Sequence, residues 1–166
     1  MVEPEMQDAL NKQFNWEQTA SQDYLAMAAW FEGLSLRGFA KFMRKQSDEE
    51  REHAMRFFKH INDRGGQVEV GSITKPRSDF GSPNDVFQAA YTREQSNTKS
   101  IHSLYGLAQE RKDYPTQTML HWFIDEQVEE EAWCEEALHL LEMVGDNKSA
   151  LLMLDKRYGA QAQDGD

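Results

Sequence analysis

The placement of turn-forming residues constrains the fold of this chain more than any other feature. Only 10 glycines and 4 prolines occur in 166 residues, and many of them stand at the ends of long segments in which apolar residues recur at every third or fourth position. This period is typical of amphipathic helices. It predicts four long helices and a short fifth one, at residues 5–33, 38–65, 83–111, 114–144 and 148–157.

The lengths of the connections predict how these helices are arranged. Short turns join the first helix to the second and the third to the fourth, so each pair forms an antiparallel hairpin. Residues 67–82 lack a helical period and are long for a connection within a compact domain. Such a segment can climb the full height of a bundle, which makes the second and third helices parallel. We therefore expect residues 1–166 to form a single all-α domain, a four-helix bundle with one long crossover.

Signals for helix ends agree with this scheme. Gly65 follows a basic last turn, which is a common way for a helix to end. Ser82 precedes a proline, so it can cap a helix whose first position the proline occupies. The sequence Asp113-Tyr114-Pro115 restarts the chain as a helix after a short turn.

The charge balance excludes several classes of partner. The chain carries 18 basic and 29 acidic residues, a net charge of −11, whereas nucleic acids and anionic membranes attract basic patches. No run approaches the roughly 18 apolar residues of a membrane span, and the N-terminal MVEPEMQDALNKQF lacks the apolar region of a secretory signal. A single cysteine, Cys134, excludes an intrachain disulfide. We expect a cytoplasmic protein that binds neither nucleic acid nor membrane and attracts cations.

Each long helix has a polar interruption near the middle of its apolar stripe. These residues are Glu17 on the first helix, Glu50 and His53 on the second, Glu94 on the third, and Gln127 and Glu130 on the fourth. In such a bundle the midpoints of all four long helices lie at the same height. We therefore expect these polar side chains to converge.

Buried carboxylates require a compensating cation. Without a partner each would cost several kcal/mol or become protonated. Glu50 and His53, spaced three apart, can approach one metal from one helix face, and oxygen ligands with an imidazole suit iron or manganese. A single Glu-x-x-His motif is common by chance, and acid runs are usually solvated. The conjunction of interruptions on all four helices favours a pair of metal ions.

With these residues in place, the chain resembles a bacterial non-haem ferritin over essentially its whole length. The resemblance is carried by EPEMQDALNKQ, DEEREH, the EQ of REQSNT and, most specifically, DYPTQTMLHWFIDEQVEEE. It implies a ferritin-like four-helix bundle with two iron sites. The first would consist of Glu17, Glu50, His53 and Glu94. The second would consist of Glu50, Glu94 and Glu130, with Gln127 nearby.

The resemblance implies further residue roles. Glu49, Glu126, Glu129 and Glu130 match a third, accessory iron site. Tyr24 matches a tyrosine that can supply an electron to oxygen, and Trp122 matches a tryptophan of the family pattern whose role here could be packing. Arg51 occupies the position of the haem-ligating methionine of bacterioferritins, so no haem is expected. Gln117 and Leu120 stand where animal ferritins place channel acids.

The activity implied by the resemblance is iron storage with ferroxidase chemistry. Fe(II) and O2 would be the substrates, and the ferric product would be stored in a homo-oligomeric shell of twenty-four subunits. Trp30, Leu34 and the segment ALLML are candidate interface residues or, alternatively, pack locally under the crossover. Two rival interpretations are a helical bundle that has lost its metals and a di-iron oxygenase, which would need an apolar substrate pocket beside the metals.

Overall fold

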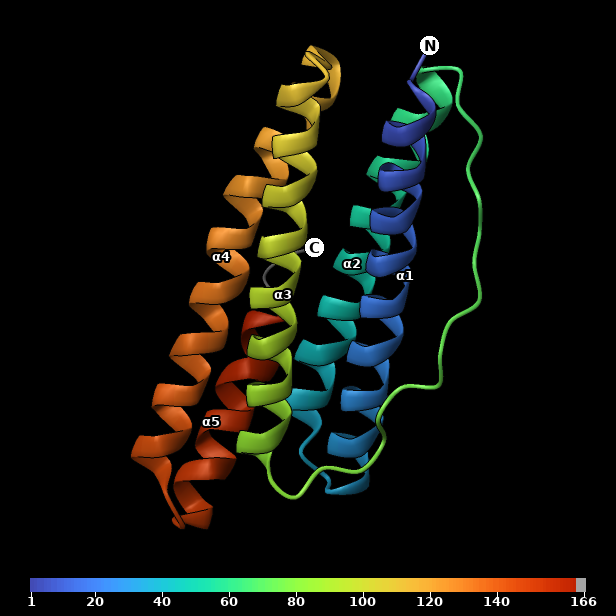
Figure 1. The fold of residues 1–166 in the computed structure, drawn as a ribbon. Helices are drawn as coiled ribbons and strands as arrows, with labels where there is room; N and C mark the ends of the chain where they lie inside the picture. The colour runs from blue at the N-terminus through green and yellow to red at the C-terminus, as the bar shows by residue number, and fades with distance from the viewer. Residues whose placement is uncertain (164–166) are drawn as a thin grey trace.

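The computed structural model describes residues 1–163, which form five helices and contain no strand (Figure 1). The helices are α1 (Pro4–Gly33), α2 (Arg37–Asp63), α3 (Pro83–Glu110), α4 (Tyr114–Val144) and α5 (Lys148–Gln161). The expected all-α fold is confirmed, and the first four helices agree with the sequence prediction to within two residues at each end.

The fifth helix is longer than predicted, because it ends at Gln161 and not at residue 157. Gly159 lies within its last turns and packs against Gly38 of α2, where a Cβ atom would come within 2.9 Å of the Gly38 Cα. Here glycine permits a close helix contact and does not stop the helix. Asp155 strengthens the same contact, because its Oδ1 accepts a hydrogen bond at 2.8 Å from the Phe39 N–H in the first turn of α2.

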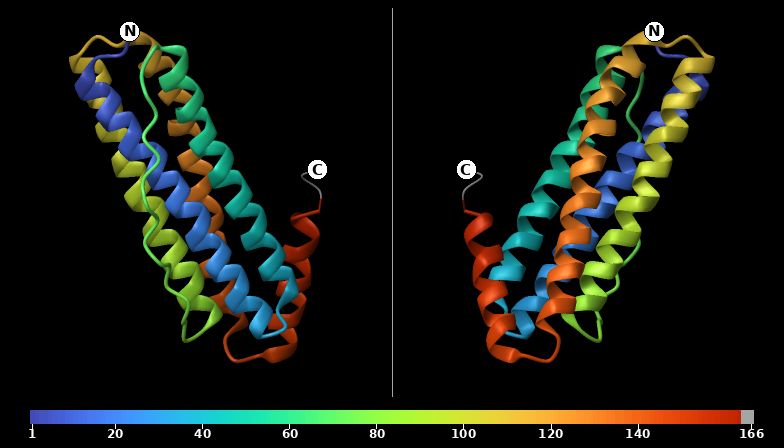
Figure 2. Two further views of the ribbon diagram at one scale, coloured as in Figure 1. Left: turned by 90° about the vertical axis from the view of Figure 1, so that its right-hand side faces the viewer. Right: turned by 90° about the vertical axis from the view of Figure 1, so that its left-hand side faces the viewer.

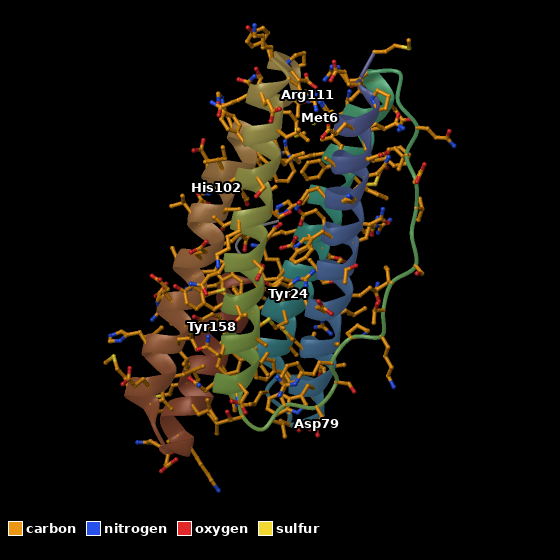
Figure 3. The ribbon with its side chains drawn as sticks, viewed as in Figure 1. Met6, Tyr24, Asp79, His102, Arg111 and Tyr158 are labelled. Atoms are coloured by element: carbon orange, nitrogen blue, oxygen red, sulfur yellow. The ribbon has the colours of Figure 1, made fainter. Side chains whose placement is uncertain are left out.

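The topology is the predicted one. In Figure 1, α1 descends, α2 ascends, and residues 64–82 then run down the outside of α1 to the base of α3, which ascends beside α4. The second and third helices are therefore parallel. Met6 and Arg111 mark one end of the bundle in Figure 3, and Asp79, near the end of the crossover, marks the other. The fifth helix lies at that second end, against α2 and α4 (Figure 2).

The helix caps follow the sequence signals. The Ser82 hydroxyl accepts a hydrogen bond from the Asp85 N–H at 3.2 Å, and the Asp113 carboxylate accepts one from the Thr116 N–H at the same distance. Gly65 follows α2 with a φ of +69°, a backbone conformation that favours glycine. No helix in the described part of the chain is long and apolar enough to span a bilayer.

A row of side-chain amides attaches the crossover to α1. Gln7 accepts a hydrogen bond from the Gln67 N–H at 2.9 Å. Asn11 donates to the Gln67 carbonyl and accepts from the Glu69 N–H, and Asn15 donates to the Glu69 carbonyl and accepts from the Gly71 N–H. Four helical residues rise about 6 Å and two extended residues about 6.6 Å, so the two spacings match. These contacts fix the register of the crossover.

The hydrophobic core consists of two clusters with a polar level between them. One cluster, near the α5 end, includes Phe31, Phe39 and Phe87. The other, near the N-terminus, includes Phe14, Phe57 and Phe123 together with neighbouring aliphatic side chains. The polar residues predicted from the sequence fall between these clusters and are themselves buried, as described next.

Candidate metal centre

Four carboxylates and one imidazole meet between the two apolar clusters. Glu17, Glu50, Glu94, Glu130 and His53 are between 0% and 4% exposed. Each of the four long helices contributes at least one of them, at the level predicted from the interrupted stripes. Figure 3 shows the region, with Tyr24 labelled on α1.

The candidate ligand atoms form overlapping groups. In each group the atoms lie within 4.8 Å of one another, which is close enough to share one ion. The groups are Glu17–Glu50–His53, Glu50–Glu94–Glu130 and His53–Glu126–Glu130. Glu50 belongs to the first two groups, so its carboxylate lies where it could bridge two ions. The expected convergence of these residues is thus present in the geometry.

The Glu50–His53 pair contains two buried polar atoms that a cation could bind. Glu50 Oε2 lies 3.5 Å from His53 Nδ1, which is long for a hydrogen bond. Both atoms are buried, and neither has a hydrogen-bond partner among the described residues. Unsatisfied buried polar atoms are rare and costly. Carboxylate oxygens with an imidazole nitrogen form a donor set that fits a hard divalent cation such as iron or manganese.

The electrostatics of the carboxylates lead to the same conclusion. Burial is the main cause that raises the pKa of Glu17, Glu50 and Glu130 well above the usual carboxyl range. Repulsion between the acids adds to it, because Glu94 raises the pKa of Glu50 and of Glu130. The pKa of Glu94 is itself raised by burial. Without a cation these groups favour protonation, and a divalent ion would restore the charged form.

Polar side chains that the sequence analysis did not identify support the ligands. Gln13 donates to Glu17 Oε1 at 2.6 Å and to Asn97 Oδ1 at 2.7 Å, and it accepts from the Ser100 hydroxyl at 2.6 Å. Asn97 also donates to Gln127 Oε1 at 3.3 Å. Gln13 lies four positions before Glu17, and Asn97 lies three after Glu94. Helical spacing from a predicted ligand was the signal that could have identified both.

Gln127 acts as a hydrogen-bond donor to Glu94. Its Nε2 lies 3.2 Å from both the carbonyl and Oε2 of Glu94, and 3.2 Å from the Thr98 hydroxyl. The amide therefore holds the Glu94 side chain in place beside the second ligand group. Gln127 therefore lies beside the Glu50–Glu94–Glu130 group.

Two oxidisable side chains also contact the ligands. The buried Tyr24 hydroxyl donates a hydrogen bond to Glu94 Oε1. The Trp133 indole N–H donates to Glu130 Oε2 at 2.5 Å. The ring centroids of Tyr24 and Trp133 are 6.2 Å apart. Burial, followed by the nearby Glu94 charge, raises the pKa of Tyr24 well above its usual value, so the phenol stays protonated.

The acids predicted for an accessory site are only partly brought together. Glu126 is half-buried and forms a group with His53 and Glu130. Glu49 is half-buried nearby, and its pKa is raised mainly by burial, with a contribution from Glu126. Glu129 is exposed and belongs to none of the ligand groups found in residues 1–163. In this geometry His53 takes part in the peripheral group, which the sequence analysis did not anticipate.

Trp122 packs against the site without a hydrogen bond to a ligand in the described residues. Its ring lies 5.3 Å from the His53 ring, and the Arg56 guanidinium lies over it at 3.7 Å from the ring centroid. Packing against His53 is therefore the role that the structure gives to this side chain.

Comparisons with known proteins place the chain in a family. A family model described as a ferritin-like domain matches residues 7–144. The bacterial non-heme ferritins of Staphylococcus aureus (strain USA300) and Staphylococcus haemolyticus (strain JCSC1435) are each 38% identical over 164 residues, which cover 99% of the chain and 99% of each relative.

Solved structures agree with this assignment. A novel open pore ferritin from the hyperthermophilic archaeon Archaeoglobus fulgidus superimposes with a TM-score of 0.95 at 39% identity, and a humanized archaeal ferritin does so with 0.95 at 40%. Each covers 96% of this chain and is itself covered to 98%. The chain therefore belongs to the ferritin family, as its resemblance to bacterial non-haem ferritins predicted.

Proposed function

We propose that this chain is the subunit of an iron-storage ferritin with ferroxidase activity. Fe(II) and O2 are its substrates, and the Fe(III) product is stored as a mineral inside a cytoplasmic shell of twenty-four subunits. The observation that carries the proposal is the Glu50–His53 pair, whose two buried polar atoms have no partner in the described residues although four buried carboxylates surround them. Family membership supports iron as the cation.

Each of the four long helices supplies ligands to one or both of the two proposed iron sites. Glu17, Glu50, His53 and Glu94 bind the first Fe(II). Glu50, Glu94 and Glu130 bind the second, with Gln127 beside them. A third, accessory iron is held at the edge of the bundle by Glu49, Glu126, Glu129 and Glu130. For this last site the geometry supports Glu126 and Glu130 more than Glu49 and Glu129, because only the first two share a ligand group.

The carboxylates determine the direction of the chemistry. Hard anionic oxygens stabilise Fe(III) more than Fe(II), so they favour loss of an electron to O2. Glu50 holds the two ions at a fixed separation, which replaces a random three-body encounter with oxygen. Gln13 and Asn97 keep Glu17 oriented through their hydrogen bonds.

The two sites are unequal, and this inequality offers a reason for turnover. His53 belongs to the first ligand group, whereas the second contains carboxylates alone. The ion at the second site therefore has no imidazole ligand, so it leaves more readily after oxidation. Tyr24 supplies one electron to oxygen while its phenolic proton passes to Glu94, the acceptor of its hydrogen bond.

The shell requires apolar surface on the outside of the bundle. Leu34 is 50% exposed, and Leu152 and Met153 of the ALLML segment are 60% and 74% exposed. These side chains are proposed interface residues. Trp30 packs instead against Phe80 of the crossover, with ring centroids 5.8 Å apart, which fits the alternative of local packing.

Two measurements on one sample test the proposal. Light scattering should give the mass of a large shell, and repeated small additions of Fe(II) in air should yield protein-bound ferric iron that co-elutes with it. A folded monomer or dimer would remove the storage function and leave the oxidation. Ferric hydroxide that precipitates at the rate seen in buffer alone would remove the ferroxidase function.

A further inference from the structure

A pocket of about 300 Å³ opens between α1, α3 and the last part of the crossover. This volume suits a small molecule. The pocket lies towards the end of the bundle that Asp79 marks in Figure 3, because Arg77 and Phe80 of the crossover form part of its wall. Apolar side chains such as Phe80, Met27 of α1 and Ala89 of α3 cover most of the wall. No lining residue belongs to a ligand group of residues 1–163, so the pocket is separate from the metal centre.

The lining carries one positive charge that no acid compensates. Arg93 Nη1 lies 2.7 Å from Asp23 Oδ2, so these two residues form a pair without net charge. Arg77 takes part in none of the ion pairs found in residues 1–163. The whole chain has a net charge of −11, so a pocket of net charge +1 differs in sign from the rest of the protein.

The Arg77 side chain is held against the wall of the pocket. Its Nε donates a hydrogen bond to the Asp79 carbonyl at 2.8 Å, and its guanidinium lies over the Phe80 ring at 4.5 Å from the centroid. These contacts use Nε and one face of the group. The two terminal nitrogens can therefore donate a pair of hydrogen bonds to a carboxylate, which is the geometry that arginine favours.

Two further nitrogens of lining residues lack an acceptor. Trp16 Nε1 and Arg93 Nε are buried, and neither has a hydrogen-bond partner in the described residues. The terminal nitrogens of Arg93 are already used by Asp23 and by the Trp16 carbonyl. Buried donors without an acceptor are rare and costly. A ligand that brings acceptor oxygens suits this wall better than one that brings donors.

We propose that this pocket binds a small organic carboxylate with an apolar body. The apolar wall covers the body, and Arg77 binds the carboxylate at the crossover. An inorganic anion would leave the apolar wall uncovered, whereas a neutral apolar molecule would leave Arg77 unpaired. The inference goes beyond the proposed ferroxidase function and does not depend on it, because the pocket shares no residue with the ligand groups.

Calorimetry of the iron-free protein with three probes tests the proposal. Phenylacetate has both the carboxylate and an apolar body. The alcohol 2-phenylethanol has the same body without the charge, and acetate has the charge without the body. We expect phenylacetate to bind with a Kd of about 1 mM or lower, as a well-fitted ligand of this size can. The other two probes should bind at least about tenfold more weakly.

Variants of the lining and of the crossover identify the groups responsible. Arg77→Gln should lower the affinity for phenylacetate about tenfold, to that of 2-phenylethanol, and leave the latter unchanged. Lys75→Gln is the matched control and should bind like the parent, because Lys75 is an exposed cation of the same crossover outside the lining. Ala89→Phe should fill the pocket and abolish binding of both aromatic probes.

Methyl spectra locate the ligand in the unmutated protein, so this measurement does not depend on the folding of a variant in the pocket. The chain contains 8 methionines, and Met27 is the one found in the lining within residues 1–163. With ¹³C-methyl methionine, phenylacetate should shift the Met27 signal, which Met27→Leu assigns. The signal of Met6, in the other apolar cluster, should stay in place.

Several results would overturn the inference. Absence of phenylacetate binding would do so directly. Equal affinity for 2-phenylethanol, or full affinity in Arg77→Gln, would show that the carboxylate is not recognised. Acetate that binds as tightly as phenylacetate would indicate a site for simple anions, and a shift at Met6 in place of Met27 would put the ligand elsewhere. The ferroxidase proposal is decided by iron oxidation, so its failure would be seen separately.

Discussion

The polar level at the centre of the bundle and the apolar clusters on either side of it follow opposite rules. In the clusters, burial of each phenylalanine contributes about 2 kcal/mol to stability, and Phe31, Phe39 and Phe87 interlock with centroids 5.1 to 6.0 Å apart. At the polar level, burial of each carboxylate costs several kcal/mol unless a partner is present. Towards both ends of the bundle, the four long helices bury apolar side chains that stabilise the fold. Near their middles, the same helices bury carboxylates whose burial opposes folding.

This contrast indicates where function resides. Glu17, Glu50, Glu94 and Glu130 have raised pKa values because they are buried close together, and Glu50 and His53 each have an atom without a partner in the described residues. A cation would reverse the sign of this contribution. Mutations in the two kinds of region should accordingly separate activity from stability.

The largest effect is expected from Glu50→Ala, which removes the shared ligand of two groups. Rapid paired oxidation of Fe(II) should fall by roughly a hundredfold or more, because both ions lose a donor and their fixed separation. Stopped-flow absorbance of ferric iron in air measures this rate. Oxidation at the parental rate would show that Glu50 does not bridge the ions.

Phe31→Ala in the apolar cluster is expected to lower stability and to leave the oxidation rate unchanged. Loss of a fully buried phenylalanine should cost about 3–5 kcal/mol in the free energy of unfolding. Urea unfolding of the iron-free protein measures this loss. Oxidation should remain near the parental rate at temperatures where the variant is folded, since Phe31 lies outside the ligand groups of residues 1–163. If the Phe31→Ala variant had normal stability and impaired oxidation, the apolar cluster would not act mainly in stability, and the account would be contradicted.

The iron-free protein should become less stable as pH rises from about 5 to 7. The folded pKa values of Glu17, Glu50 and Glu130 lie well above the ordinary 4.5, so the folded state binds more protons than the unfolded state in this range. Their stabilising contribution is complete below the unfolded pKa and is lost as pH rises through the folded pKa. Melting temperatures measured with a chelator test this slope.

Mn(II), which air does not readily oxidise between about pH 5 and 7, is the comparison ion, because it binds charged carboxylates. In its presence the melting temperature should rise over the same pH range. Glu50→Gln should flatten the slope of the iron-free protein. Identical pH profiles with chelator and with Mn(II) would show that the carboxylates do not bind a cation as a group.

The smallest effects are expected at the edge of the bundle. Glu49→Ala should keep the rapid first oxidation and change the ratio of iron to oxygen and the later turnovers, because it alters only the accessory site. Glu129→Ala should have less effect than Glu49→Ala, since Glu129 is exposed whereas Glu49 is half-buried, although neither belongs to a ligand group of residues 1–163. Oxygen consumption per added Fe(II) measures both. If Glu49→Ala stops the first oxidation as fully as Glu50→Ala, the separation of an inner and an accessory site is wrong.

The sequence was sufficient for the features that depend on local spacing. Helix ends at Ser82 and Asp113 follow from capping chemistry, and the buried acids were found because each interrupts a stripe of period three to four. Helical spacing could have predicted the Gln13–Glu17 bond, but not the supporting hydrogen bonds between helices, because their partners are far apart in the chain. Gln13 meets Asn97 across 84 positions. The amide row on α1 was missed for the same reason.

Two further differences have physical causes. The sequence predicts that α5 ends at residue 157, whereas the helix continues to Gln161. The cause is the close contact of Gly159 with Gly38 of α2, which local sequence does not reveal. The family resemblance places Glu129 with Glu126 in the accessory site. On a helix these residues lie three apart, but the ligand group at the edge is completed by His53 from α2. Spacing within one helix does not show which side chains a second helix brings close.

Anaerobic titration with Fe(II) tests the central claim most directly. Calorimetry of the iron-free protein under nitrogen should show two tightly bound Fe(II) per subunit, or three if the accessory site is filled. Glu50→Ala should abolish the tight pair, and Glu129→Ala should leave it unchanged. A flat titration, or one that saturates at a single Fe(II) per subunit, would contradict a centre built to hold two ions.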